Sequence, residues 1–254
     1  MNINLQNKNV LITGASRGIG KAIAISFAEA GANVIIHYNN NESYANNTLN
    51  SLKSNNHTIV KADLKDPIAI ENLVKEVSSK YKTIDVLINN AGIYEEKPFL
   101  EMDYDEWQEN WFRTLNTNLQ GVANLSFLVA KSMKEQGEGK IINISSRGAF
   151  RGEPNAPAYG ASKAGLNSLS QSMAKALAPY NIFVYVIAPG YVNTDMVKDI
   201  MTGPNAQSFI DQSPLKRIAE PNEIAKTAVF LASENTDYLT GCIIDINGAS
   251  YLRS

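Results

Sequence analysis

The chain has 254 residues, of which 44% are hydrophobic and 19% charged, with a formal net charge of -2 and a pI near 5.8. This length suits one α/β domain of a globular protein. We expect no nucleic-acid partner, because no Lys/Arg cluster could follow a phosphate backbone. We also expect no membrane partner and a cytoplasmic location, because the sequence shows neither a membrane-spanning run nor a signal peptide.

Apolar, β-branched runs alternate with helical patterns along the chain. The expected strands are Val10–Thr13, Asn33–His37, Thr58–Val60, Ile84–Ile88, Lys140–Ile144, Ile182–Ile187 and Cys242–Ile246. The expected helices are Ile19–Ala30, Glu42–Ser54, Ile68–Tyr81, Tyr104–Gln136, Tyr159–Pro179 and Asn222–Ser233. The strands are continuously apolar, as in a parallel sheet that helices cover on both faces.

These elements predict an α/β fold, a doubly wound parallel seven-stranded sheet in a single domain over residues 1–254, which is a Rossmann fold. A closed (β/α)₈ barrel is the alternative, but one strand is missing. The stretch 191–215 follows a strand, contains Gly203-Pro204 and Ser213-Pro214, and predicts a substrate lid. A plain surface loop is the alternative interpretation of this stretch.

The first strand leads into a glycine-rich turn, TGASRGIG, and then directly into a helix. Glycines allow a tight turn and close approach of the backbone to a pyrophosphate, and the helix N-terminus supplies free N–H groups. A structural turn that binds no ligand is the alternative.

The same residues also match the Gly-x-Ser-x-Gly pattern of hydrolases around Ser16. The only histidines are His37 and His57, so a triad would need Ser16, Glu42 and His57 within the first three strands, which disfavours a hydrolase.

The second strand ends at His37-Tyr38-Asn39, without the acid that would bind a ribose 2′-hydroxyl. Arg17 lies in the phosphate turn, where it could meet a 2′-phosphate. The sequence therefore favours NADP(H) as the cofactor, with NAD(H) as the alternative. Arg17 could also simply be a solvated surface residue.

Cys242 is the only cysteine, so we expect no disulfide within the chain. No cluster of His, Cys and carboxylates has metal-ligand spacing, so we expect no metal.

Tyr159 and Lys163 lie four residues apart in a predicted helix, so both side chains project from one face. A nearby cation lowers the pKa of a phenol, which would make Tyr159 an acid or base near neutrality. A solvated surface pair is the common alternative for this spacing.

Several motifs in order resemble the short-chain dehydrogenase/reductase family over essentially the whole chain. They are TGASRGIG, Asp63-Leu64, Asn89-Asn90-Ala91-Gly92, Asn118-Leu119-Gln120-Gly121, Ile144-Ser145-Ser146, Tyr159-x-x-x-Lys163 and Pro189-Gly190-Tyr191-Val192-Asn193-Thr194. Asn247-Gly248-Ala249 departs from the Asp-Gly-Gly that is common at the end of the family's last strand.

The resemblance implies catalytic roles for four residues. Tyr159 would be the general acid or base, and Lys163 would lower its pKa and hold the nicotinamide ribose. Ser146 would hydrogen-bond the substrate oxygen, and Asn118 would support a water-mediated proton relay.

The resemblance also implies residues that bind the cofactor and the substrate. The cofactor set is Gly14, Ser16, Arg17, Gly18, Ile19, Gly20, Tyr38, Asn39, Asp63, Leu64, Asn90, Ala91, Gly92, Tyr159, Lys163, Pro189, Gly190, Val192 and Thr194. The candidate substrate set is Arg147, Phe150, Arg151, Tyr191 and Met196. The arginines would either welcome an acidic substrate or carrier protein, or face solvent or make structural salt bridges.

The implied activity is hydride transfer between a nicotinamide and a carbonyl or secondary alcohol. A 3-oxoacyl-carrier-protein reductase is one member that the layout resembles, and an NAD(H)-dependent sugar or small-alcohol dehydrogenase is the alternative. A dinucleotide-binding regulator without catalysis is the alternative from another class. The family also suggests a homotetramer with contacts through the helices at 104–136 and 159–179.

Overall fold

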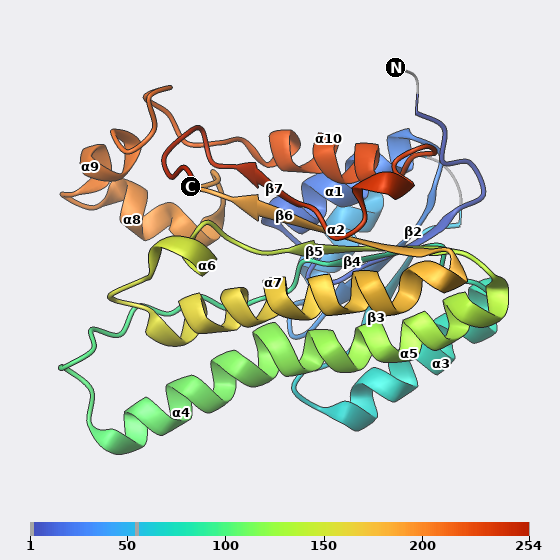
Figure 1. Ribbon diagram of the computed structural model, residues 1–254, viewed down its shortest axis with the longest axis horizontal. Coiled ribbons are helices and arrows are strands. Elements are labelled where there is room, and N and C mark those ends of the chain that lie inside the picture. The colour runs from blue at the N-terminus through green and yellow to red at the C-terminus, as the bar shows by residue number, and fades with distance from the viewer. Residues whose placement is uncertain (1–2, 54–55, 254) are drawn as a thin grey trace.

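The computed structural model describes residues 3–53 and 56–253. Its centre is a seven-stranded parallel sheet in the order β3-β2-β1-β4-β5-β6-β7 (Figure 1). The strands are β1 (Asn9–Ile12), β2 (Asn33–Tyr38), β3 (Thr58–Lys61), β4 (Val86–Asn89), β5 (Gly139–Ile144), β6 (Ile182–Pro189) and β7 (Ile243–Ile246). The predicted doubly wound sheet is confirmed, and because β3 and β7 form opposite edges, the barrel alternative is wrong.

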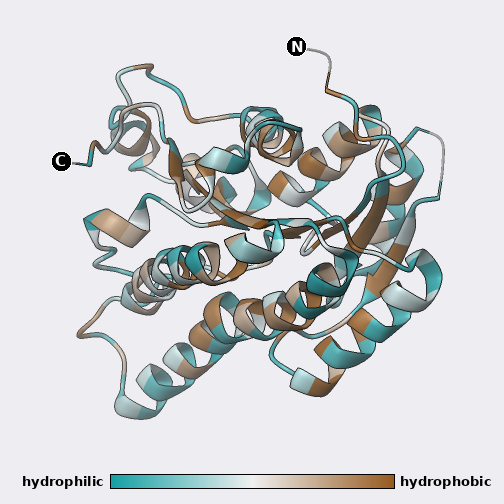
Figure 2. Cartoon of the chain, turned by 45° about the vertical axis from the view of Figure 1, so that its right-hand side comes forward, coloured by the Kyte–Doolittle hydropathy of each residue, from teal (hydrophilic) through white to brown (hydrophobic). Residues whose placement is uncertain are grey.

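Helices cover both faces of the sheet (Figures 1 and 2). The larger ones are α1 (Gly18–Glu29), α2 (Glu42–Ser51), α3 (Pro67–Tyr81), α4 (Tyr104–Leu115), α5 (Gly121–Gln136), α7 (Pro157–Leu177) and α10 (Pro221–Ala232). Buried residues of α1, α2 and α10 pack on one face, and those of α3, α5 and α7 pack on the other. The predicted end of the second helix at Ser54 lies outside the described residues.

The pleat of each strand divides its apolar run between these two layers. In β1, Val10 and Ile12 belong to the cluster under α1 and α10, whereas Leu11 belongs to the cluster under α3 and α5. All three side chains are fully buried. This explains why the strand is apolar at every position and does not alternate.

The helix that we expected over Tyr104–Gln136 is interrupted. A π-helical turn at Asn116–Gln120 separates α4 from α5. The first residue of α5, Gly121, lies so close to the loop after β3 that an added Cβ would come 2.2 Å from the carbonyl oxygen of Leu64. Such π turns in α-helices are frequently found at functional sites, and this one holds Asn118.

The segment between β6 and α10 is more regular than its sequence indicates. It contains a 3₁₀ turn (Asp195–Val197), α8 (Lys198–Thr202) and α9 (Ala206–Ile210), which lie beyond the carboxyl end of β6 (Figure 1). Among the helices of the described residues, none combines the length and the hydropathy that crossing a bilayer requires.

Candidate active site

A cleft of about 600 Å³ opens at the carboxyl ends of the strands, at the point where the strand order reverses between β1 and β4. In open α/β sheets, ligands bind at this point. Most of the predicted site residues line it: Gly14, Ser16, Arg17, Gly18, Ile19, Tyr38, Asn39, Asp63, Leu64, Asn90, Ala91, Gly92, Ser146, Arg147, Tyr159, Lys163, Pro189, Gly190, Tyr191, Val192, Thr194 and Met196. Gly20, Asn118, Phe150 and Arg151 are outside this lining.

The glycine-rich turn forms a backbone cradle at one end of the cleft. Gly14 and Gly18 have φ angles of 62° and 56°, in the left-handed region that favours glycine. A Cβ on Gly14 would come 2.9 Å from the Cα of Ala91, so the turn lies against the loop after β4. The side-chain amide of Asn90 fixes this contact by donating to the carbonyl oxygens of Thr13 (2.9 Å) and Gly14 (3.1 Å).

This cradle fits a diphosphate group. Helix α1 begins at Gly18, and within the described residues no side chain caps its first turn. The free N–H groups and the positive end of the helix dipole therefore face the cleft, where an anion can bind. Gly20 does not line the cleft but lies behind the cradle, where a Cβ would come 2.4 Å from the Gly14 carbonyl oxygen.

His37 supports the cradle from the end of β2 and is buried. Its Nδ1 accepts a hydrogen bond from the Gly14 N–H (3.2 Å), so its Nε2 carries the proton and donates to the Ala62 carbonyl (3.0 Å). Burial lowers the pKa of His37 from 6.5 to about 4. The imidazole is therefore neutral at pH 7 in the folded protein.

This burial predicts a loss of stability in acid. The unfolded chain binds a proton at His37 as the pH falls below 6.5, whereas the folded chain binds it only near pH 4. The contribution of neutral His37 to the free energy of unfolding is therefore fully present above pH 6.5 and is lost as the pH falls through 4. The loss amounts to about 2 to 3 kcal/mol at pH 4.5. Between pH 7 and pH 4.5, the free energy of unfolding measured with urea should fall less in His37→Gln than in wild type, by this amount. If the free energy of unfolding depended on pH in the same way for both proteins, this prediction would be contradicted.

The predicted catalytic side chains converge at the other end of the cleft. Tyr159 and Lys163 come from the first turns of α7, whose N1 residue is Pro157, and Ser146 follows β5. Lys163 is 4% exposed, and its Nζ donates to the Ile144 carbonyl oxygen at 2.8 Å and lies 5.8 Å from the centre of the Tyr159 ring. The Ser146 hydroxyl accepts the N–H of Gly148 at 3.0 Å. The pair is not a solvated surface pair.

The structure corrects the sign of the expected pKa shift. Burial raises the pKa of Tyr159 to about 12 and outweighs the opposing effect of a hydrogen bond with Ser146. Burial also lowers the pKa of Lys163 to about 8, so its ammonium is itself poorly stabilised. In the free protein the phenol is therefore protonated at neutral pH and is able to donate a proton.

Asn118 is fully buried and is held by backbone groups. Its Oδ1 accepts from the Ile93 N–H at 2.8 Å, and its Nδ2 donates to the Ile93 carbonyl at 2.9 Å and to the Ser162 hydroxyl at 3.2 Å. The π turn thus fixes the loop after β4 against α7. Its predicted part in a proton relay stays a prediction.

Arg17 lies at the cradle end of the cleft, beside the neutral end of β2. Its side chain is 63% exposed, and its NH1 is 3.6 Å from Asp195, which belongs to the segment after β6.

The alternative hydrolase triad is not assembled. Ser16 follows the carboxyl end of β1, whereas His57 precedes β3 and accepts from the N–H of Val34 at the start of β2, so the two lie at opposite ends of the strands.

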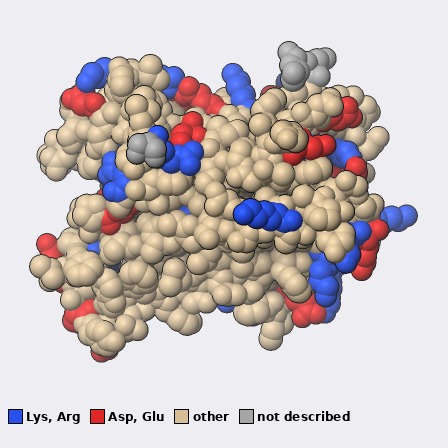
Figure 3. Space-filling view, viewed as in Figure 1, with Lys and Arg blue, Asp and Glu red and all other residues tan. Residues whose placement is uncertain are grey.

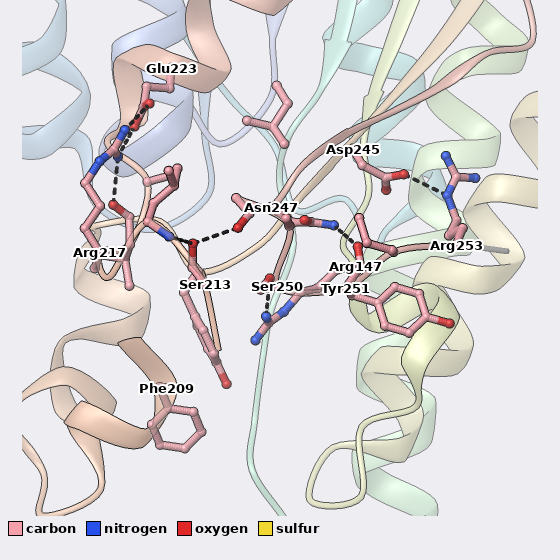
Figure 4. Close-up of a pocket in the computed structure, with 18 residues that line it drawn as sticks. Arg147, Phe209, Ser213, Arg217, Glu223, Asp245, Asn247, Ser250, Tyr251 and Arg253 are labelled. Carbon is pink, nitrogen blue, oxygen red and sulfur yellow. Dashed lines mark hydrogen bonds and ion pairs between the residues drawn. The ribbon is translucent and has the colours of Figure 1, made fainter. Parts of the chain in front are cut away.

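Arg147 lines both the cleft and a second cavity of about 700 Å³, which lies beside the C-terminal segment (Figure 4). It is 3% exposed, donates to Ser250 and Gln212, and stacks on Tyr191 with 4.5 Å to the ring centre. The solvent-facing alternative is therefore wrong for Arg147. Phe150 lies away from the cleft, because its ring packs under the guanidinium of Arg253 at 4.5 Å.

Two ion pairs line the second cavity. Arg217 forms two hydrogen bonds with Glu223, and Arg253 pairs with Asp245 at 2.8 Å (Figure 4). Asn247, which replaces the family's Asp, donates to the carbonyl of Tyr251 at 2.9 Å and preserves the turn. Ala249 adopts a φ of 56°, a conformation that glycine takes without strain.

Two residues that the sequence analysis did not single out line the substrate end of the cleft. The ring of Tyr94 meets the ring of Tyr159 edge-on, with 5.0 Å between centroids and an interplanar angle of 89°. Glu153 lies between α6 (Gly148–Arg151) and α7. Neither belongs to a regular element, and the only signal for Tyr94 was its place just after the Asn89-Asn90-Ala91-Gly92 motif.

Comparisons with known proteins agree with this geometry. A family model described as Enoyl-(Acyl carrier protein) reductase matches residues 14–249. The 3-oxoacyl-[acyl-carrier-protein] reductase FabG of Staphylococcus epidermidis is 36% identical over 97% of this chain and its own full length. The protein of the same name from Aquifex aeolicus is 37% identical over 99% of this chain and its full length.

A solved structure gives the same result. The crystal structure of a short chain dehydrogenase from Burkholderia cenocepacia in complex with NADP superposes with a TM-score of 0.89 at 30% identity, over 97% of this chain and 99% of that one. The chain is therefore a member of the short-chain dehydrogenase/reductase family, oxidoreductases that act on CH–OH groups with NAD(P).

Proposed function

We propose that the protein is an NADP(H)-dependent oxidoreductase that interconverts a carbonyl and a secondary alcohol. One observation carries this proposal: Ser146, Tyr159 and Lys163 line the same cleft as the glycine-rich cradle. When bound, the dinucleotide would supply or accept the hydride. Tyr159 would give its proton to the carbonyl oxygen, Ser146 would hydrogen-bond that oxygen, and the buried Lys163 would orient the nicotinamide ribose.

NADP(H) is the proposed cofactor. The Burkholderia relative was crystallised with NADP, and no acid stands at the end of β2, where Tyr38, Asn39, Asn40 and Asn41 line the cleft. Arg17 is the cation nearest to the turn, and it would exchange its 3.6 Å contact with Asp195 for a 2′-phosphate.

Arg17→Ala should therefore weaken NADPH binding far more than NADH binding. Because the contact is exposed, we expect a loss on the order of 10-fold for NADPH and less than about 2-fold for NADH. Fluorescence titration of both cofactors against wild type and Arg17→Ala measures this. Equal losses for the two cofactors would contradict the 2′-phosphate assignment, and Lys21→Ala, in the first turn of α1, is the matched control.

The names of the relatives make a 3-oxoacyl group on acyl carrier protein the first substrate to test. A sugar or small-alcohol dehydrogenase, with NAD(H) as the alternative cofactor, is the second, and the polar lining at Glu153 favours it. The test is NADPH consumption with a 3-oxoacyl thioester, hydroxylated ketones, oxidised sugars and simple ketones. NADPH binding without consumption in any arm would instead support a regulator without catalysis.

We also propose a homotetramer, and a cytoplasmic location stays a prediction. Tyr104 and Phe112 on α4 and Phe127 on α5 are each at least 62% exposed. Figure 3 shows that the surface over α5 and α7 carries few charged side chains. Such a surface suits contact with a second copy. Sedimentation at micromolar concentration tests it, and a monomer mass would contradict it.

A further inference from the structure

The substrate end of the cleft contains a carboxyl group that lies beside the reacting centre. Glu153 lines the cleft together with Ser146 and Tyr159. Its Oε1 lies over the start of α6, where a Cβ added to Gly148 would come 2.6 Å from it. The N–H of Gly148 donates to the Ser146 hydroxyl at 3.0 Å. The Glu153 carboxyl group and the Ser146 hydroxyl therefore both lie next to Gly148.

The carboxyl group of Glu153 is largely removed from water but is not satisfied by the protein. Its side chain is 14% exposed, and its nearest cation is the Nε of Arg151 at 3.5 Å. Across residues 3–53 and 56–253, no hydrogen bond reaches this carboxyl group. A desolvated carboxylate without hydrogen bonds is costly, and burial accordingly raises the pKa of Glu153.

The neighbouring polar groups in the cleft are already engaged. The Tyr94 hydroxyl donates to Glu96 at 2.8 Å, and its ring packs edge-on against Tyr159. Arg147 donates to Ser250 and Gln212 and faces the second cavity as well. The carboxyl group of Glu153 is thus an acceptor on this wall that receives no hydrogen bond from the described residues and can accept one from a ligand.

We infer that Glu153 is a specificity-determining residue that accepts a hydrogen bond from a hydroxyl group of the substrate close to the reacting carbonyl. The substrate class is then a hydroxylated ketone or the corresponding polyol or sugar. This inference rests on the proposed carbonyl reduction and names its substrate. An alkyl chain in the same place would leave the carboxyl group desolvated and without a hydrogen bond, with only its 3.5 Å ion pair to Arg151.

The test compares acetoin with butanone, two ketones that differ by one hydroxyl, using NADPH and steady-state kcat/KM. Wild type should prefer acetoin, and Glu153→Leu should reduce this preference by on the order of 10- to 100-fold. The intrinsic reactivity of each ketone cancels when the preference is compared between variants. Glu153→Gln, whose amide oxygen still accepts a neutral hydrogen bond, should fall between them.

Glu96→Gln is the matched control, because Glu96 is a nearby carboxylate outside the cleft lining and should leave the preference unchanged. An unchanged preference in Glu153→Leu that still binds NADPH would overturn the assignment, and so would an unchanged preference in the isosteric Glu153→Gln if the Leu variant does not fold. In both cases butanone and acetoin are still reduced, so the proposed function survives. No NADPH consumption by wild type with any carbonyl would overturn both.

Discussion

Tyr159→Phe is expected to lower kcat by about 10³-fold or more while leaving NADPH affinity within about 3-fold of wild type. The substitution removes the hydroxyl that lies beside Ser146 and keeps the ring that packs against Tyr94 at 5.0 Å. A positioned proton donor contributes typically 10² to 10⁴ in rate, so its loss appears in turnover and not in binding. Single-turnover kinetics and a fluorescence titration of NADPH measure the two quantities separately.

Tyr251→Phe is the control for this experiment, since Tyr251 lines the second cavity and its hydroxyl only donates to the carbonyl of Phe150 at 3.4 Å. It should retain turnover within about 3-fold. Turnover of Tyr159→Phe at the wild-type rate would remove the phenol from the mechanism. An equal loss of turnover in both variants would show that the effect is not specific to the Tyr159 hydroxyl.

Gly20→Ala is expected to abolish measurable dinucleotide binding. The added Cβ would come 2.4 Å from the Gly14 carbonyl oxygen and 2.6 Å from the Asn90 side-chain nitrogen, so the cradle must move. Both atoms belong to the hydrogen bond that fixes the turn against the loop after β4. Helix propensity alone predicts the opposite effect, a gain of about 1 kcal/mol, because Ala is the better helix former. Calorimetric titration with NADPH and the thermal unfolding midpoint measure both effects.

Gly160→Ala is the matched substitution in α7. An added Cβ there meets the Gly148 carbonyl oxygen at 3.5 Å, an ordinary contact, so this variant should bind NADPH normally and unfold at the same or a higher temperature. If Gly20→Ala bound NADPH as Gly160→Ala does, the close packing behind the cradle would not be required for binding. The pair separates steric exclusion from a general effect of Gly-to-Ala changes.

The strands and most helices could be predicted from the sequence because both faces of a parallel sheet are buried. Val10, Leu11 and Ile12 serve different core layers, yet all must be apolar, and this leaves a continuous run. The interruption of the long helix could not be read in the same way, because the local sequence suits an α-helix. Its signal was Gly121, whose close approach to Leu64 exists only in the folded chain.

The proximity of Tyr159 and Lys163 was predictable from their spacing, but the direction of the Tyr159 pKa shift was not. Spacing places Lys163 beside the phenol, whereas the desolvation that raises the pKa depends on how deeply α7 is buried. Tyr94 and Glu153 were missed for a related reason. They lie in connections whose path is set by packing, and neither periodicity nor a short motif says which way such side chains face.

The strand order has a consequence for how the polypeptide acquires its ligand during synthesis. The cradle comes from β1 and β4, near the beginning of the chain, whereas Ser146, Tyr159 and Thr194 reach the same cleft from its second half. A ribosome-bound fragment ending before β5 would contain the residues of the cradle but not those proposed to hold the nicotinamide. Only a chain that extends past Thr194 can therefore gain the full stabilisation that a dinucleotide confers by binding the native state alone.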